Sequence, residues 1–442
     1  MTASPAYDKN GKTPALGKHF HRFWAGSLSS NLADGLMFTA LPLLATTFTN
    51  DPLLVAGLAV ARYLPWLLFG LVGGVLVDRW DRGRLMIAAN LVRSVVLVVL
   101  AALVATGNAG IWALYVVMFT VMTCEIFYDL AGRAMLPNLA PARALDRANG
   151  RLVSGKTITE DFGGAPLAGL LFVVAAALPL AVNAGAYLLG ALVLLGLPLA
   201  ARRPSPSSKP GEAKSAGMRA VFADMAEGLR FSFGDRPLRS MIAFSVVTNM
   251  SFMAMNAVMV LLIQDHFGVP AALYGVFLTS SAVGALVGAL LVGRLVSAAG
   301  RFRLQATGFV LMGVCCVSFG LAPNAYMAAA VWAVLGAVMT VSNTVMVGVL
   351  QLSVPNELLG RVMSAAQMLG FGLTPLGAVL GGLLGRVELW LPPVVTGAVN
   401  ILALVAVLPA LRALTTRANE AEEKAARATR EAPDQGMEEA RD

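Results

Sequence analysis

The chain has 442 residues, of which 57% are hydrophobic and only 13% are charged, whereas an average soluble domain carries about 25% charged residues. A soluble globule with this composition would expose large apolar patches and aggregate, so the composition excludes an ordinary soluble domain and favours a bundle of membrane helices. The net charge of +8 does not indicate a nucleic-acid partner, because the Lys and Arg residues lie between apolar runs, as in the cytoplasmic loops of membrane proteins.

A membrane-spanning helix needs about 20 mainly apolar residues, and twelve runs of this kind follow one another along the chain. We predict spans at residues 23–48, 53–77, 85–106, 111–136, 150–176, 178–200, 238–264, 272–298, 304–322, 325–351, 361–386 and 389–411. The fold class predicted is therefore an all-α membrane protein with twelve transmembrane helices.

The two halves of the chain are related by a weak internal repeat. A shift of roughly 215 residues lays Gly73 on Gly288 and Asp34 on Asn249, and weak repetition of this kind is typical of transporters. We therefore predict two pseudo-symmetric six-helix halves and five regions in all. These regions are an N-terminal segment at 1–22, a first half at 23–201, a linker at 202–236, a second half at 237–411 and a charged tail at 412–442.

The positively charged residues alternate from one loop to the next. They precede the first span or follow an even-numbered span at Lys18, Arg22, Arg79, Arg82, Arg84, Arg143, Arg147, Arg151, Arg202, Arg203, Arg294, Arg301, Arg303, Arg361, Arg412 and Arg417. Arg386 is the exception among the intervening loops. Basic loops stay in the cytoplasm, so we expect a multi-pass protein of the cell inner (plasma) membrane with both termini and the linker on the cytoplasmic side.

The second part of the linker has apolar residues three or four positions apart. They are Met218, Val221, Phe222, Met225, Leu229 and Phe233. This spacing predicts an amphipathic helix that lies on the inner face of the membrane.

Charged side chains within the predicted spans are confined mostly to the first half. The acids are Asp34, Glu125, Asp129, Glu160 and Asp161, and the bases are Arg62, Arg93 and Lys156. A charge at mid-membrane depth is costly, so it usually faces a cavity or pairs with an opposite charge. We expect Lys156 to pair with Glu160 one turn away, and Arg93 or Arg62 to pair with Asp34 or with an acid of the fourth span.

An acid that remains without a basic partner is a candidate to carry a coupling proton, and all five acids are candidates on this ground. Asp34 and Glu125 are the first choices because they lie deepest. Asp34 is about 10 residues into its span, which corresponds to roughly 15 Å of helix.

Residues 73–85 form a short loop motif between the second and third spans. They read Gly-Gly-Val-Leu-Val-Asp-Arg-Trp-Asp-Arg-Gly-Arg-Leu. Further motifs are Asp-Leu-Ala-Gly-Arg-Ala-Met-Leu-Pro at 129–137, Gly-Leu-Arg-Phe at 228–231 and Pro-Asn-Glu-Leu-Leu-Gly-Arg at 355–361. On these motifs the chain resembles the major facilitator superfamily over residues 18–412, and within it the branch that holds macrolide-efflux proteins and the enterobactin exporter.

The resemblance implies a secondary active transporter that exports an amphipathic small molecule, such as a drug, antibiotic, siderophore or metabolite, in exchange for protons by alternating access. It implies a conformational latch formed by Gly74, Asp78, Arg79, Arg82 and Arg84. Residues 163–169 are similar to the family's antiporter motif, which implies a helix bend at Pro166, with a counterpart at Pro375. Uptake of a small solute and a non-transporting receptor or scaffold on the same fold are the alternatives.

A substrate cavity would be lined by apolar and amide side chains. The candidates are Met37, Phe38, Phe127, Phe162, Asn249, Phe252, Met255, Asn256, Asn343, Gln367, Met368 and Phe371. Methionine adapts to varied ligands, whereas amides within a membrane bind a substrate or connect helices by hydrogen bonds.

Other kinds of site are not indicated. Residues 150–157 match the phosphate-loop pattern, but that pattern counts only between a strand and a helix of an α/β domain, so we expect no nucleotide. Cys124, Cys315 and Cys316 lie in apolar runs without metal-ligand spacing. We expect no enzyme activity, no cofactor and no metal, and a monomer whose partners are membrane lipid, protons and a small-molecule substrate.

Overall fold

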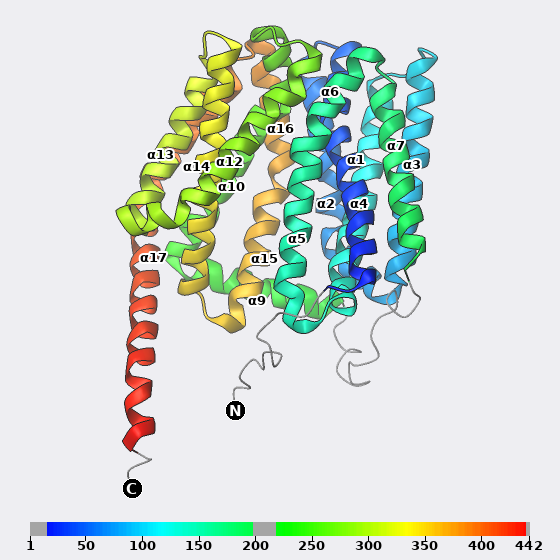
Figure 1. Ribbon diagram of the computed structural model, residues 1–442. Helices are drawn as coiled ribbons and strands as arrows, with labels where there is room; N and C mark the ends of the chain where they lie inside the picture. The colour runs from blue at the N-terminus through cyan, green and yellow to red at the C-terminus, as the bar shows by residue number, and fades with distance from the viewer. Residues whose placement is uncertain (1–15, 198–217, 439–442) are drawn as a thin grey trace. The chain divides into compact units, whose positions relative to one another are not determined.

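The computed structural model describes residues 16–197 and 218–438, and in these residues it contains helices and no strand (Figure 1). Twelve helical segments of this described part are long and apolar enough to cross a membrane. Each of the predicted runs overlaps one of them. The predicted all-α membrane fold is confirmed.

The described helices form two compact units, each with its own internal contacts. The first unit contains every described helix up to Leu195, together with the segment Ala257–Thr279. The second unit contains Val221–Asn256 and the chain from Ser280 onward. The division at residues 23–201 and 237–411 stays a prediction.

The first unit is built around its first helix. Its elements are α1 (Lys18–Phe48), α2 (Pro52–Arg79), α3 (Arg82–Ala105), α4 (Ile111–Leu139), η1 (Ala142–Ala144), α5 (Leu145–Thr157), the π-helix η2 (Ile158–Gly164), α6 (Ala165–Val174), α7 (Leu178–Leu195), α11 (Met259–Leu261), the π-helix η3 (Leu262–His266) and the start of α12 (Ala271–Ala299). α1 packs against α7, η2 and α6, and α3 packs between α4 and α7. This arrangement buries most of α1.

Close contact between α1 and η2 depends on two glycines. A Cβ atom at Gly35 would lie 2.3 Å from the backbone oxygen of Glu160, and one at Gly164 would lie 2.7 Å from Cα of Gly35. Small residues let helix backbones approach each other in membranes. The backbone of η2 therefore touches α1 one residue beyond Asp34.

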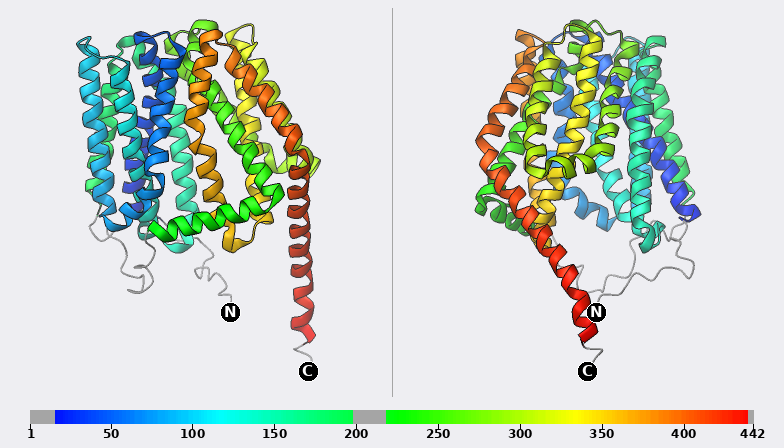
Figure 2. Two further views of the ribbon diagram at one scale, coloured as in Figure 1. Left: turned by 180° about the vertical axis from the view of Figure 1, so that it is seen from behind. Right: turned by 60° about the vertical axis from the view of Figure 1, so that its left-hand side comes forward.

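The second unit ends in one long helix. Its elements are α9 (Met218–Gly234), α10 (Arg236–Ala257), the remainder of α12, α13 (Arg301–Gly320), α14 (Ala325–Ser353), α15 (Asn356–Gly372), α16 (Thr374–Val387) and α17 (Leu391–Glu438). α13 packs against α14 and α17. α17 continues as a single helix past the predicted end of its span at residue 411 (Figure 2).

Three ion pairs among the described residues of the second unit join α15 to α9, α13 to α17, and α17 to Asp235, which lies between α9 and α10. They are Arg361–Glu227, Arg417–Asp235 and Arg301–Glu422, each with a nitrogen–oxygen distance of 2.6 Å. A Cβ atom at Gly228 would lie 2.6 Å from the backbone oxygen of Arg361. The linker helix α9 is thus held against the start of α15.

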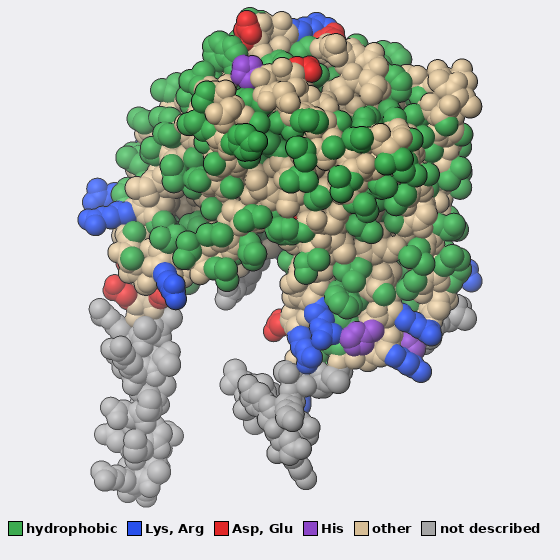
Figure 3. Space-filling view, turned by 45° about the horizontal axis from the view of Figure 1, so that its top comes forward, with side chains coloured by type: hydrophobic (Ala, Val, Ile, Leu, Met, Phe, Trp, Pro, Cys, Tyr) green, Lys and Arg blue, Asp and Glu red, His purple; other side chains and the backbone are tan. Residues whose placement is uncertain are grey.

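The outward faces of the helices are apolar. On α3 the exposed fractions of Val95, Val98 and Val99 are 61%, 55% and 53%. Figure 3 shows hydrophobic side chains spread over the face in view, with few Lys and Arg side chains, which lie towards its margins. A surface of this kind is stable in lipid, where apolar residues are the default.

Candidate functional site

A buried charge cluster lies in the first unit, formed by Asp34 on α1, Arg93 on α3, Glu125 on α4 and Tyr187 on α7. Arg93 Nη1 lies 3.6 Å from Asp34 Oδ1, and the Tyr187 hydroxyl donates a hydrogen bond of 2.5 Å to the same oxygen. Arg93 and Tyr187 are fully buried, and Asp34 and Glu125 are 3% and 9% exposed. The expected pairing of Arg93 with Asp34 is present.

The Arg93 guanidinium is held mainly by charge and by aromatic rings. Its carbon lies 5.4 Å from the ring centre of Tyr128 and 5.1 Å from that of Tyr187, within the range of cation–π attraction. Its nitrogens make no hydrogen bond with the described residues. Arg93 interacts electrostatically with both Asp34 and Glu125, so one fully buried cation is shared by two carboxyl groups, and the partly exposed Lys156 also acts on both.

Glu125 differs from Asp34 in forming no ion pair within 4 Å and no side-chain hydrogen bond with a residue that the structure describes. Its Oε2 is buried and makes no hydrogen bond with any residue that the structure describes. Leaving a buried polar atom unpaired costs about 1–3 kcal/mol, and more when it is charged. The neutral, protonated form of Glu125 suits this position better than the carboxylate, because it carries no uncompensated charge.

Apart from Arg62, the remaining candidate charges lie on α4, α5 and η2. Lys156 Nζ lies 3.4 Å from Glu160 Oε2, so the second expected ion pair is present. Asp161 is exposed and its backbone oxygen accepts a hydrogen bond from Thr279. Asp129 is half-buried.

Arg62 does not pair with an acid among the described residues. Its guanidinium carbon lies 3.6 Å from the ring centre of Phe38, close enough for a strong cation–π contact. Phe38 was predicted to line a substrate cavity, and one face of its ring is covered by Arg62.

Of the residues predicted to form the latch, only Arg82 and Arg84 have side chains that the structure describes, and both lie on α3. Arg82 Nη1 donates a hydrogen bond of 2.8 Å to the backbone oxygen of Ala134. Arg84 lies 4.0 Å from Asp81, which also caps α3 by accepting a hydrogen bond from the Arg84 backbone. The surroundings of Gly74 and the side chains of Asp78 and Arg79 lie outside the described part.

Both prolines predicted to bend a helix lie where a helix changes form. Pro166 lies in the first turn of α6, directly after the π-helix η2, and Pro375 lies in the first turn of α16, directly after α15 ends. Proline has no backbone donor and favours a first helical turn. Helix interruptions with π segments are frequent at functional sites.

The cavity candidates do not all come together. Met37 and Met255 are fully buried in packing. The Asn256 side chain bonds to the backbone oxygen of Phe252 in its own helix, and the Phe252 ring stacks on Trp332 at 6.4 Å. Each of these four candidate side chains therefore has a packing or helix-internal role in the structure.

The other cavity candidates are placed separately. Phe127 packs against Phe69, and Phe162 lies half-buried in η2. Gln367 and Met368 are exposed on α15, and the side chain of Phe371 lies outside the described part.

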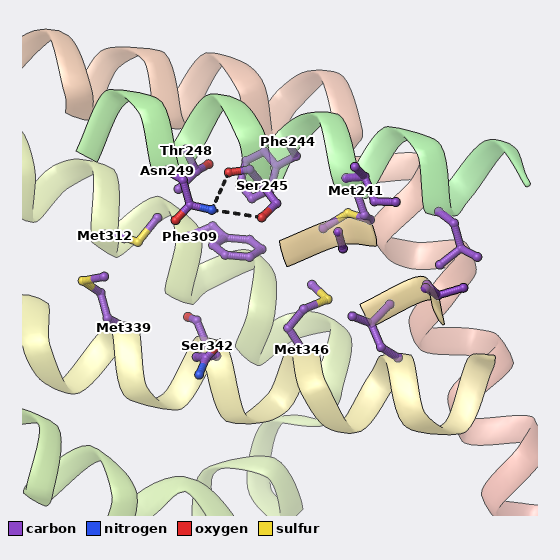
Figure 4. A pocket seen from close by; sticks show the side chains of 16 residues that line it. Met241, Phe244, Ser245, Thr248, Asn249, Phe309, Met312, Met339, Ser342 and Met346 are labelled. Atoms are coloured by element: carbon purple, nitrogen blue, oxygen red, sulfur yellow. Dashed lines mark hydrogen bonds between the residues drawn. The ribbon is translucent and has the colours of Figure 1, made fainter. Parts of the chain in front are cut away.

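Two of the predicted amides do share a cavity, and it lies wholly within the second unit. The cavity has a volume of about 230 Å³, and Asn249 and Asn343 are among the residues that line it (Figure 4). Asn249 Nδ2 donates to the backbone oxygen and the hydroxyl of Ser245, at 2.8 and 3.2 Å.

Sequence reasoning missed Tyr187 and the residues that surround the two amides. Tyr187 is a buried phenol in an apolar helix, and buried tyrosines usually find a hydrogen-bond partner. That signal was available in the sequence. The identity of the partner was not, because Asp34 lies 153 positions away along the chain.

The stretch that matches the phosphate-loop pattern lies inside a helix. Residues 150–157 fall within α5, and Lys156 pairs with Glu160. A phosphate loop needs a loop conformation between a strand and a helix, which this segment does not adopt.

Comparisons with known proteins agree with the fold and the motifs. The chain is 25% identical to macrolide efflux protein A of Streptococcus pyogenes over 366 residues, which is 82% of this chain and 88% of that protein. It is 28% identical to the multidrug efflux pump Tap of Mycobacterium tuberculosis over 404 residues, which is 88% of this chain and 93% of that protein.

Solved structures show the same fold at low sequence identity. The nucleoside transporter NupG superposes with a TM-score of 0.70 at 11% identity, covering 90% of this chain and 100% of that chain. A bacterial homologue of the iron transporter ferroportin superposes with a TM-score of 0.69 at 16% identity, covering 91% and 100%.

The family model described as "Transmembrane secretion effector" matches residues 11–441, nearly the whole chain. Together with the twelve apolar helices, this match makes the protein a multi-pass membrane transporter and not an enzyme. The chain belongs to the transmembrane secretion effector family of the major facilitator superfamily.

Proposed function

We propose that the chain is a proton-coupled exporter of amphipathic small molecules that works by alternating access. Export is supported by its likeness to proteins named as macrolide and multidrug efflux pumps. In the proposal the protein acts as a monomer, with both termini in the cytoplasm.

Proton coupling rests on one observation: two buried carboxyl groups share one buried cation. With Glu125 protonated, Arg93 and Asp34 form a neutral pair. When Glu125 loses its proton, Asp34 and Glu125 compete for Arg93 and a net negative charge remains among buried groups. That charge is costly without water.

The cost couples the proton to the conformation. Release of the proton from Glu125 is favourable only in a state that opens the charge cluster to water, and rebinding of a proton lets the cluster close again. A proton that is bound on one side and released on the other thereby shifts the population between two states of the transporter. Because the exported molecule uses the same two states, its movement is driven by the proton gradient.

The test is transport by the full chain in proteoliposomes with an imposed pH gradient, using a macrolide antibiotic as the substrate. Glu125→Gln cannot exchange a proton, so gradient-driven transport should fall by at least about tenfold. Exchange of labelled for unlabelled macrolide without a gradient should continue, since Gln keeps the shape and neutrality of the protonated acid.

The matched control is Asp129→Asn, which neutralises a half-buried acid one turn further along α4. It should retain most of the gradient-driven transport. Full gradient-driven transport by Glu125→Gln would refute the assignment of the proton to this residue. Absence of transport for every tested compound, together with tight binding of a partner protein, would favour a receptor or scaffold instead.

A further inference from the structure

The cavity of the second unit is lined mainly by apolar side chains, with a smaller number of hydroxyl and amide side chains among them. Four methionines contribute, Met241 from α10, Met312 from α13, and Met339 and Met346 from α14. In Figure 4 the labelled side chains of α10 and α14 reach towards each other from opposite walls. Methionine is unbranched and polarisable, so such a lining adapts to ligands of different outline.

Two hydroxyl groups in this lining have no hydrogen-bond partner in the part of the chain that the structure describes. Ser342 is 5% exposed, and its Oγ is buried without a hydrogen bond to any described residue. Thr248 Oγ1 on α10 is likewise buried and makes no hydrogen bond with a described residue. Buried hydroxyls are nearly always hydrogen-bonded, so these two are available to a ligand that brings its own polar atom.

Among the lining residues that the structure describes there is no Asp, Glu, Lys, Arg or His side chain. A charged group placed here would lose its hydration without gaining an opposite charge, which is strongly unfavourable. The cavity therefore selects for uncharged groups. The buried charge cluster, in contrast, belongs to the first unit, so the charge and the apolar cavity are on different units.

The size of the cavity limits the ligand further. An apolar protein cavity of roughly 150 Å³ is enough to hold a benzene ring, and this one measures about 230 Å³. It has room for two fused rings or an equivalent aliphatic group. Asn343, one of the lining residues, is itself exposed, so a larger molecule bound in the cavity could extend past it.

We infer that this cavity is a binding subsite for an uncharged ring or aliphatic group that carries one hydroxyl or similar polar atom, which bonds to the buried Oγ of Ser342. That the group belongs to an exported molecule rests on the proposed function. Binding itself does not, because it requires neither a proton gradient nor a second conformation.

The experiment measures equilibrium binding of tritiated 1-naphthol to the purified full chain in detergent, without any gradient. Naphthalene, which lacks the hydroxyl, and 1-naphthoate, which carries a negative charge, are the comparison probes. We expect 1-naphthol to bind and 1-naphthoate to bind at least about tenfold more weakly.

Two variants locate the binding. Met346→Trp fills the cavity and should weaken binding of 1-naphthol and naphthalene alike by at least about tenfold. Ser342→Ala removes one free hydroxyl and should weaken binding of 1-naphthol about fivefold, while naphthalene is unaffected. The matched control is Val334→Trp, which adds the same ring to α14 at a position that is 46% exposed, and it should bind both probes normally.

Unchanged binding in Met346→Trp and Ser342→Ala, or an equal loss in the Val334→Trp control, would overturn the inference. If Met346→Trp fails to give a monodisperse protein, the contrast between the two probes in Ser342→Ala still decides. If the probes bind as expected but no gradient-driven export occurs, the subsite is supported and the proposed function is contradicted. If export occurs but the cavity variants do not change binding, the proposed function is supported and the subsite is contradicted.

Discussion

Arg93 and Asp34 carry opposite charges at a depth where neither is stable alone. Replacing one member of a buried ion pair leaves the other uncompensated and costs about 3–5 kcal/mol. Arg93→Met should therefore lower the thermal stability of the purified protein strongly. The double variant Asp34→Asn with Arg93→Met leaves no charge on either residue and should recover most of that loss, because well-packed neutral residues can replace a buried pair.

The measurement is the apparent melting temperature of both single variants and the double variant in one detergent, analysed as a double-mutant cycle. The exposed pair Arg417–Asp235 of the second unit serves as the comparison, since its side chains are 46% and 24% exposed and such pairs contribute little. Additive losses at Arg93 and Asp34 would contradict the interpretation that the two residues act as a unit.

For individual residues, the sequence predicted which side chains are unusual for a membrane helix better than it predicted which side chains contact each other. The charges of the first half stand out because charge is rare in apolar runs, and the pairs Arg93–Asp34 and Lys156–Glu160 are present. The partnership of Arg62 with Phe38 was not predicted. Helical periodicity gives the face of a side chain within its own helix but not the helix that packs against it.

Among the elements, α1 and η2 approach each other so closely that a single methyl group matters. Gly35→Ala would place Cβ 2.3 Å from the backbone oxygen of Glu160, and backbone cannot move aside as a side chain can. The two helices must separate, at a cost of about 1–3 kcal/mol for overpacking. We expect a lower melting temperature and weaker gradient-driven transport, because η2 carries Glu160 and lies beside Asp34.

Gly185→Ala is the matched control, since it makes the same change inside α7, where no atom lies within 4 Å of the added Cβ. Alanine is favoured over glycine within helices by roughly 0.5–1 kcal/mol, so this variant should be unchanged or slightly more stable. Equal melting temperatures for Gly35→Ala and Gly185→Ala would show that the close approach does not limit packing.

The positions of the helices were predictable because the thickness of the bilayer sets the length of an apolar helix that spans it. The changes of helix type within one span were not predictable. The fifth predicted span, at 150–176, begins five residues earlier as α5 and changes to the π-helix η2 and then to α6. A π segment depends on contacts with neighbouring helices, here at Gly35 and Gly164, and an apolar run does not encode it.

On the scale of the whole molecule, the repeat in the sequence agrees with a transporter fold, but the contact units do not divide the chain at a single point. The segment Ala257–Thr279 belongs with the first unit. Within that unit, Thr46 bonds to Gln264, and Thr279 bonds to the backbone oxygen of Asp161. Bonds of this kind join distant parts of the chain, so periodicity along the sequence cannot reveal them.

The orientation of the chain in the membrane is a prediction from charge alone, and it can be tested by labelling. In a chain whose cysteines Cys124, Cys315 and Cys316 are replaced by Ala, a new cysteine is introduced at Asn108 or at Ala298. Asn108 is exposed in the loop between α3 and α4, which has no Lys or Arg, whereas Ala298 is exposed between Arg294 and Arg301. Because basic loops remain in the cytoplasm, an impermeant maleimide added to intact cells should label Asn108→Cys and should reach Ala298→Cys only after the membrane is permeabilised. The reverse pattern would invert the proposed topology and, with it, the direction of export relative to the charged loops.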